Sequence, residues 1–365
     1  MICCVNCFVD SEIKGIIESL NNKGKCDICN SNNVFIYNTN INNNLVDSFN
    51  ELLSIYTPKT SLPSDFPIEK LSLLKDELYN NWNIFSKSIE NENIYHIIVE
   101  ICSEKYQESP ELFYEPIGIL DANDTQYLEK ESILKNNKWE DFVTEIKTKN
   151  RFHTHYINTD ALKKLLRYIE RPFKKGSKFY RARISNKNEF SSKDMYAPPP
   201  EKATAGRVNP LGINYLYLAT NQITSIHEIR AGAYDYLTIG EFELIEDIRI
   251  VDFTLIEKIS PFYPTIDAQL LAINKKHLQK ISNEMAKPVR KSDGPLDYLP
   301  TQYIADFIKS IEDNDNQAYH GIKYKSTLYK KGENIALFNQ KVCKCADVTH
   351  YDIESIDYKT DPILT

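Results

Sequence analysis

The chain lacks any run of about 18 consecutive apolar residues, the length that a membrane-spanning helix needs. Its first residues, MICCVNCFVDSEIKG, contain neither the basic stretch nor the apolar stretch of a signal peptide. We therefore expect no membrane partner and a cytoplasmic location. Cysteines in that compartment are more often thiols or metal ligands than disulfides, and this chain has 8 of them.

Several common catalytic motifs are also missing. The sequence has no Gly-rich phosphate loop, no Ser-His-Asp arrangement and no H-E-x-x-H helix, because His227-Glu228 is not followed by a second histidine at the required spacing. The formal net charge is −7, and Lys and Arg are sparse around the N-terminal cysteines. Contacts to phosphates require cations, so we do not expect nucleic acid as a partner.

The remaining composition is that of an ordinary globular protein, with 42% hydrophobic and 26% charged residues in 365 positions. That length accommodates two or three domains. Three segments differ in pattern, and we predict an α+β protein with an N-terminal zinc ribbon at residues 1–44, a helical domain at 45–170 and a mixed α/β domain at 171–365.

Periodicity supports the last two segments. Between residues 45 and 170, four apolar sets repeat at helical spacing: Leu71, Leu74, Leu78 and Trp82; Ile94, Ile97, Ile98 and Ile101; Leu134, Phe142, Val143 and Ile146; Leu162, Leu165, Leu166 and Ile169. After Pro172 the short segments KFYRARI, NYLYLA, LTIGEFEL, IRIVDF, HGIKYKS and NIALF predict strands, with helices beginning near Asn221 and Pro300.

The N-terminal cysteines have the spacing of a metal site. Cys4-x2-Cys7 and Cys26-x2-Cys29 are separated by 18 residues, and two such pairs complete a tetrahedral zinc site. Four thiolates leave no open coordination position, so this zinc is predicted to be structural. Cys3-x3-Cys7 is the alternative first pair. Three other cysteines are interpreted as small apolar residues: Cys102 in a helix, and Cys343 and Cys345 at a strand edge.

Five segments occur in an order that resembles the RES domain over about residues 170–340: Arg181 in KFYRAR, Gly206-Arg207-Val208-Asn209 with Gly212, Tyr217-Leu218-Ala219, Glu228, and Gly321 to Ser326. The sequence departs from the family at Val208, where an aromatic residue is common. The resemblance implies a fold like that of diphtheria-toxin-type ADP-ribosyltransferases. It also implies a toxin that consumes NAD⁺ by hydrolysis, phosphorolysis or ADP-ribosyl transfer.

The resemblance, with the chemistry of the residue types, implies a role for each residue. Glu228 would stabilise the positive charge that develops on the ribose when nicotinamide leaves. Arg181 and Arg207 would bind the pyrophosphate, with Arg183 as the alternative to Arg181. Tyr217 would contact the nicotinamide ring, and Ser326 would donate to a phosphate or to the amide of the base. Without the ordered motifs, Glu228 would be a solvated helix residue and Tyr217 a core residue.

The helical segment resembles the HEPN-like regions that precede RES domains in longer bacterial proteins. Neither Arg151-x-His153 nor Arg151-x3-His155 has the spacing of a HEPN ribonuclease, so RNA cleavage is not expected. We expect a toxin or defence effector that binds NAD⁺, an antitoxin or regulatory protein as partner, and a homo-oligomer. The alternative is a binding protein, in which the zinc ribbon contacts nucleic acid or protein beside an inactive RES scaffold.

Overall fold

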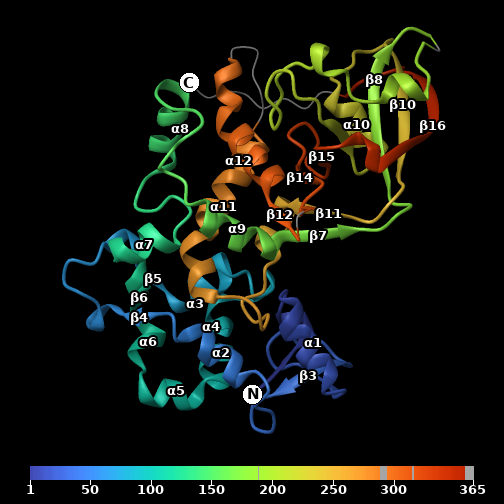
Figure 1. Cartoon of the computed structure of the whole chain (residues 1–365). Helices are drawn as coiled ribbons and strands as arrows, with labels where there is room; N and C mark the ends of the chain where they lie inside the picture. The colour runs from blue at the N-terminus through green and yellow to red at the C-terminus, as the bar shows by residue number, and fades with distance from the viewer. Residues whose placement is uncertain (188, 288–293, 315, 358–365) are drawn as a thin grey trace, which may run out of the picture. The chain divides into compact units, whose positions relative to one another are not determined.

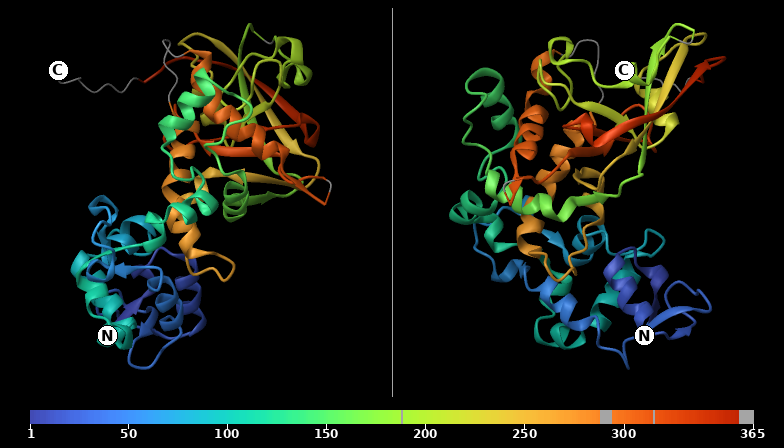
Figure 2. Two further views of the ribbon diagram at one scale, coloured as in Figure 1. Left: turned by 60° about the vertical axis from the view of Figure 1, so that its left-hand side comes forward. Right: turned by 45° about the vertical axis from the view of Figure 1, so that its right-hand side comes forward.

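The computed structural model describes residues 1–187, 189–287, 294–314 and 316–357 (Figures 1 and 2). The chain divides into two compact units, residues 1–136 with 255–276, and residues 137–254 with 277–365. Both helices and sheets are present in quantity, which confirms the α+β prediction. The division at residues 44 and 170 stays a prediction. Within the described ranges, no helix combines the length and the apolar character needed to cross a membrane.

The first unit begins with a small sheet that carries the cysteines. Strands β1 (Ile2–Cys4), β3 (Val34–Asn38) and β2 (Lys23–Gly24) are antiparallel neighbours in that order. Helix α1 (Ser11–Ser19) fills the spacer between the two cysteine pairs. Asp10 caps this helix by accepting hydrogen bonds from the backbone N–H groups of Glu12 and Ile13.

The rest of the first unit is mainly helical. Its helices are α2 (Val46–Leu53), α3 (Leu74–Asp76), α4 (Asn91–Ile101), α5 (Ser103–Glu108), α6 (Glu111–Tyr114) and α7 (Thr125–Glu131). The periodicity from Leu71 to Trp82 predicted a helix, and α3 continues as a π-helix over Glu77–Asn81. Only the start of the segment differs: β5 (Ser72–Leu73) pairs with β6 (Pro116–Gly118), which also pairs with β4 (Thr57–Pro58), and these ladder hydrogen bonds keep it extended.

The second unit is built on an eight-stranded sheet in the order β16-β10-β8-β9-β15-β14-β11-β7. The strands are β7 (Glu170–Phe173), β8 (Lys178–Ser185), β9 (Leu216–Ala219), β10 (Tyr236–Leu244), β11 (Ile248–Asp252), β14 (Gly321–Lys325), β15 (Glu333–Leu337) and β16 (Cys343–Asp352). Six were predicted as segments; of β16 only the strand edge at Cys343 and Cys345 was expected, and β7 was not predicted. Every neighbouring pair is antiparallel except β11 with β14. In Figure 2, β16 is the red strand at the edge of this sheet.

Helices α8 (Trp139–Thr148), α9 (Thr159–Leu166), α10 (Gln222–Glu228) and α12 (Leu299–Ser310) also belong to the second unit. The predicted helices near Asn221 and Pro300 are α10 and α12. The long helix α11 (Ala268–Met285) was not predicted; its first part belongs to the first unit and its end to the second. A short pair, β12 (Glu312–Asp313) with β13 (Asn316–Gln317), follows α12.

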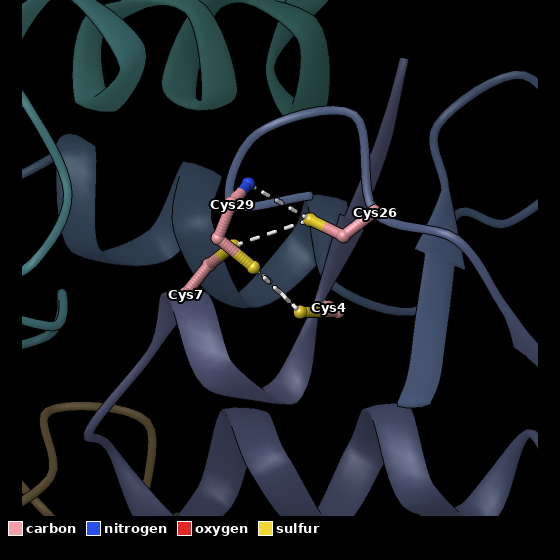
Figure 3. A group of neighbouring side chains, drawn as sticks. All are labelled: Cys4, Cys7, Cys26 and Cys29. Atoms are coloured by element: carbon pink, nitrogen blue, oxygen red, sulfur yellow. Dashed lines mark hydrogen bonds between the residues drawn. The ribbon is translucent and has the colours of Figure 1, made fainter. Parts of the chain in front are cut away.

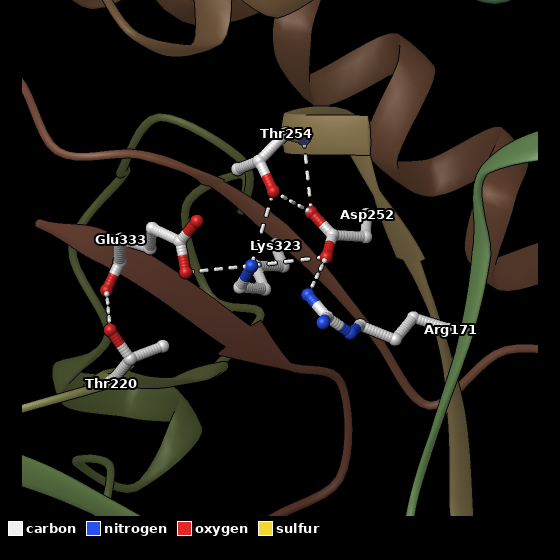
Figure 4. Close-up of polar contacts among 6 residues, drawn as sticks. All are labelled: Arg171, Thr220, Asp252, Thr254, Lys323 and Glu333. Atoms are coloured by element: carbon white, nitrogen blue, oxygen red, sulfur yellow. Dashed lines mark hydrogen bonds and ion pairs between the residues drawn. The ribbon is translucent and has the colours of Figure 1, made fainter. Parts of the chain in front are cut away.

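One face of the sheet carries a group of charged side chains, of which Lys323 and Asp252 are buried and Arg171 and Glu333 are partly exposed (Figure 4). Lys323 on β14 is 1% exposed, and its Nζ contacts Asp252 Oδ2 at 3.0 Å, Glu333 Oε2 at 2.7 Å and Thr254 Oγ1 at 3.1 Å. Arg171 Nη1 adds a second cation, 2.9 Å from Asp252 Oδ2. Because two cations face two carboxylates, the group is neutral as a whole, which makes its burial tolerable.

Candidate active site and metal centre

Four cysteine side chains converge at the N-terminal sheet (Figure 3). The sulfur atoms of Cys4, Cys7, Cys26 and Cys29 all lie within 4.8 Å of one another. Cys4 Sγ is 3.9 Å from Cys7 Sγ and 3.4 Å from Cys29 Sγ. Four sulfurs at Zn–S distances of about 2.3 Å in a tetrahedron are separated by roughly 3.8 Å, so the cluster is close to the size that a metal requires.

The predicted ligand set is the one that comes together. Cys3 precedes Cys4 on β1 and is buried, but the cluster is formed by Cys4 and not by its neighbour. The cluster can hold a metal ion, and its four sulfurs leave no position for a substrate. Cys102 and Cys343 are buried among apolar residues, as predicted, and Cys343 and Cys345 lie on the edge strand β16.

A cavity of about 260 Å³ lies on the sheet of the second unit and brings together residues that are far apart in sequence. Its lining comes from β8, β9, α10, β14 and β15 and includes three of the predicted residues, Arg181, Tyr217 and Glu228. Ser326 does not line the cavity but contacts Glu228 directly. The remaining predicted residue, Arg207, lies elsewhere.

Arg181 is the charged group of this cavity that lacks a partner. Among the described residues, its Nη1 is buried and has no hydrogen-bond acceptor. Burial, and then repulsion from Arg183, lower the pKa of Arg181 to about 10. A guanidinium remains protonated at neutral pH even so, so the cavity contains a cation that forms no ion pair with a described residue. That arrangement favours an anionic ligand.

Arg183, the alternative to Arg181, is already engaged. Its Nη1 donates to the backbone carbonyl of Asp194, and its guanidinium lies 4.3 Å from the centre of the Phe190 ring. The geometry therefore favours Arg181 over Arg183 as the arginine that faces a ligand.

Glu228 ends α10 with one carboxylate oxygen held in place. Ser326 Oγ donates to Oε1 at 2.5 Å, and Asn334 Nδ2 donates to the same oxygen at 2.8 Å. Ser326 Oγ accepts in turn from the backbone N–H groups of Leu328 (3.3 Å) and Tyr329 (3.1 Å). The serine therefore orients the glutamate, and its hydroxyl is not free for a phosphate or a base.

Helix α10 is short, and its position is fixed at its start. Asn221 caps it: Asn221 Oδ1 accepts from the N–H of Thr224 at 2.9 Å and from the Thr224 hydroxyl at 2.9 Å. The preceding Thr220 is bonded through its N–H to the carbonyl of Glu333 at 3.0 Å. These contacts anchor the helix to β15, so Glu228 projects from a defined place.

The Gly-Arg-Val-Asn turn is held together by the side chain of Asn209. The two N–H groups of the buried amide nitrogen are shared among three carbonyl oxygens, those of Thr204, Pro210 and Ile213. Asn209 Oδ1 accepts from the Tyr217 hydroxyl at 2.5 Å, while the Tyr217 ring lines the cavity. Burial raises the pKa of Tyr217, so its hydroxyl stays a donor.

Glycine is required at two positions of this turn, for a different reason at each. A Cβ on Gly206 would stand 2.7 Å from the Tyr217 hydroxyl, closer than atoms pack. Gly212 has φ +82°, in the left-handed region that glycine adopts without strain. The motif spacing thus reflects how the loop closes on Tyr217.

Arg207 turns away from this cavity toward the end of α11. Its Nη1 donates to the carbonyl of Glu284 at 2.9 Å, and its Nη2 donates to the carbonyl of Lys287. It lines a second cavity, of about 460 Å³, bordered by α8, α11 and α12. The carbonyls at the end of a helix carry partial negative charge, which explains why a guanidinium binds there.

Tyr180, Tyr324 and Asn334 are among the residues that line the first cavity and were not singled out in the sequence. Tyr324 and Asn334 are directly opposite each other on β14 and β15. Tyr324 follows Lys323, and the alternation of side chains along a strand puts it on the face opposite the buried charges. The alternation in GIKYKS predicts that Lys323 and Tyr324 lie on opposite faces of the sheet. It does not predict which of the two faces lines the cavity.

Comparison with known families gives one result. The family model described as the RES domain matches residues 178–361. No curated protein and no solved structure matches the chain.

Proposed function

The chain belongs to the RES domain family, a toxin-like family associated with NAD-using enzymes, and on that premise we propose that it cleaves the bond between nicotinamide and ribose in NAD⁺. One observation supports the proposal most strongly. The buried Nη1 of Arg181, which has no hydrogen-bond partner in the described ranges, and the oriented carboxylate of Glu228 belong to residues that line the same cavity. The arginine suits the phosphate groups of a ligand, and the carboxylate suits a ribose on which positive charge develops during the reaction.

The chemistry requires little proton transfer on the leaving group. Nicotinamide departs with the electron pair of the C–N bond and becomes neutral, while positive charge spreads over the ribose ring oxygen and C1. A carboxylate near the ribose stabilises that charge. An acceptor then bonds to C1; when the acceptor is water, it loses a proton and ADP-ribose is formed.

Each predicted residue has a place in this proposal. Arg181 binds the pyrophosphate, and Glu228 faces the ribose with Oε2. Tyr217 presents its ring to the nicotinamide, with its hydroxyl held by Asn209. Ser326 acts on Glu228 and not on NAD⁺ directly. Arg207 holds the Gly-Arg loop on the end of α11 and so supports Tyr217 from behind.

The test is incubation of the full chain with NAD⁺, with and without phosphate, and separation of the products by mass. Free nicotinamide is expected, and the mass of the second product identifies water or phosphate as acceptor. A labelled-NAD⁺ assay on lysate detects transfer to a macromolecule. Intact NAD⁺ in all three assays would refute the proposed function.

Glu228→Gln is the matched variant, because an amide keeps the size of the side chain and loses its charge. We expect turnover to fall by about 10³-fold or more, in line with loss of a main electrostatic contact, with no change in the unfolding midpoint. Glu246→Gln, on the exposed turn between β10 and β11, is the control and should keep full activity. Full activity of the Glu228 variant would remove Glu228 from the mechanism.

We also propose that the cysteine cluster binds zinc and that the zinc is structural. The four buried or half-buried sulfurs and the absence of a fifth ligand position support this. Membership of the family further suggests an antitoxin or regulatory protein as partner. A homo-oligomer stays a prediction.

A further inference from the structure

Asn334 is a buried polar residue in the middle of the large sheet. Its side chain is 7% exposed and lines the cavity. On β15 it pairs with Ala219 of β9 on one side and with Tyr324 of β14 on the other. Its backbone is therefore held from both sides by neighbouring strands.

The contact with Glu228 fixes the orientation of this amide. The side chain approaches Glu228 Oε1 to 2.8 Å. A carboxylate oxygen only accepts, so the group facing it must be the NH₂ of the amide, since the amide oxygen would repel it. A hydrogen bond to an ionised group contributes more than one between neutral groups.

We propose that Asn334 is a positioning residue for Glu228: it fixes Oε1, together with Ser326, and leaves Oε2 directed at the ligand. The expected effect on kcat rests on the proposed function, cleavage of NAD⁺. Among the described residues, Oε1 has two donors and Oε2 has none. The two oxygens thus have different tasks, one structural and one chemical.

The two donors differ in how firmly they are held. Ser326 lies on the turn after β14, where its hydroxyl also accepts two backbone N–H groups. Asn334 lies inside a central strand, and its neighbour Glu333 is anchored on the opposite face by Lys323 Nζ at 2.7 Å (Figure 4). The carbonyl of Glu333 also accepts the N–H of Thr220, one residue before the cap of α10. Strand β15 therefore contacts three features: Lys323 in the charged group, Thr220 at the start of α10, and the carboxylate of Glu228 at the end of α10.

The first experiment separates kcat from KM for NAD⁺. Asn334→Ala is expected to lower kcat by about 10- to 100-fold, the range for losing a hydrogen bond to a charged group, and to change KM less than threefold. Asn334→Asp keeps the size of the side chain but replaces the donor by an acceptor. It should be at least as impaired, whereas a residue that only fills space would tolerate it. Asn339→Ala, an exposed cap two residues beyond β15, is the control.

Unchanged kcat in Asn334→Ala, beside an inactive Glu228→Gln, would overturn the inference and leave the proposed function standing. Absence of turnover in the wild-type chain would instead refute the function. A crystal structure of Asn334→Ala then decides the inference by itself. The carboxylate of Glu228 is expected to leave its wild-type position or to occupy two, and an undisplaced carboxylate would show that Ser326 alone positions it.

Discussion

Replacing Arg181 by methionine should make the protein more stable while removing its ligand. Arg181 Nη1 is buried without a partner in the described part of the chain, and its pKa falls to about 10 from 12.5. This lowering of the pKa corresponds to roughly 3 kcal/mol. Partial solvent contact and the lost packing of the long side chain reduce the expected gain to about 1–3 kcal/mol in the free energy of unfolding.

The pH dependence of this gain follows from the sign of the shift. A cation whose pKa is lowered by folding destabilises the folded state at every pH below the folded pKa. The penalty diminishes only as the pH rises from about 10, where the folded arginine begins to lose its proton. The difference between Arg181→Met and the wild type should therefore be constant between about pH 6 and 9.

Thermal unfolding with and without ADP-ribose provides the assay. Each kcal/mol corresponds to roughly 2–4 °C for a unit of this size, so the variant should unfold several degrees higher than the wild type. Added ADP-ribose should raise the midpoint of the wild type and leave the variant unchanged. Arg183→Met is the control, because Arg183 has partners, and it should be neutral or destabilising. A variant that unfolds at a lower temperature, or that still responds to ADP-ribose, would refute the reasoning.

Three further results are expected. Purified protein should contain about one zinc per chain, measured by elemental analysis, and Cys4→Ser should lose it and expose residues 1–44 to protease; full zinc content in the variant would contradict this. Lys323→Met should lower the free energy of unfolding by up to about 3 kcal/mol, measured in urea, since the fully buried carboxylate of Asp252 keeps only the partly exposed Arg171 as a cation. Gly206→Ala should reduce NAD⁺ turnover and the unfolding midpoint together, because a Cβ there collides with the Tyr217 hydroxyl; a variant with wild-type kinetics would show that the loop can yield.

The apolar pattern of short segments predicted the strands and helices that have one face packed against a core. Strands β8 to β11, β14 and β15 were all found from their apolar and β-branched content. Strand β16 was not predicted beyond Cys345 because, as an edge strand, most of its residues are exposed and polar. Helix α11 was missed because its buried face includes Asn274 and Lys275, which interrupt the apolar stripe.

The candidate site was predictable in its residue types but not in its contacts. Glu228 and Ser326 are 98 positions apart, so only the fold reveals that the serine serves the carboxylate. Arg207 reaches carbonyls 77 and 80 positions away, which no local spacing encodes. Asn334 stood in a segment already interpreted as a strand, and nothing near it in sequence indicated that its amide would face a carboxylate.

The discontinuous composition of the two units limits how this chain can be divided or recombined. Residues 255–276 lie inside the segment matched by the RES family model but pack with residues 1–136, for example through Phe262 against Phe49. A cut anywhere between residues 136 and 255 would therefore separate residues 255–276 from residues 1–136 and expose the apolar side chains that pack between them. The RES segment of this chain is not a cassette that gene fusion could transplant intact. The core of the first unit is complete only with residues 255–276, which come from inside the matched segment.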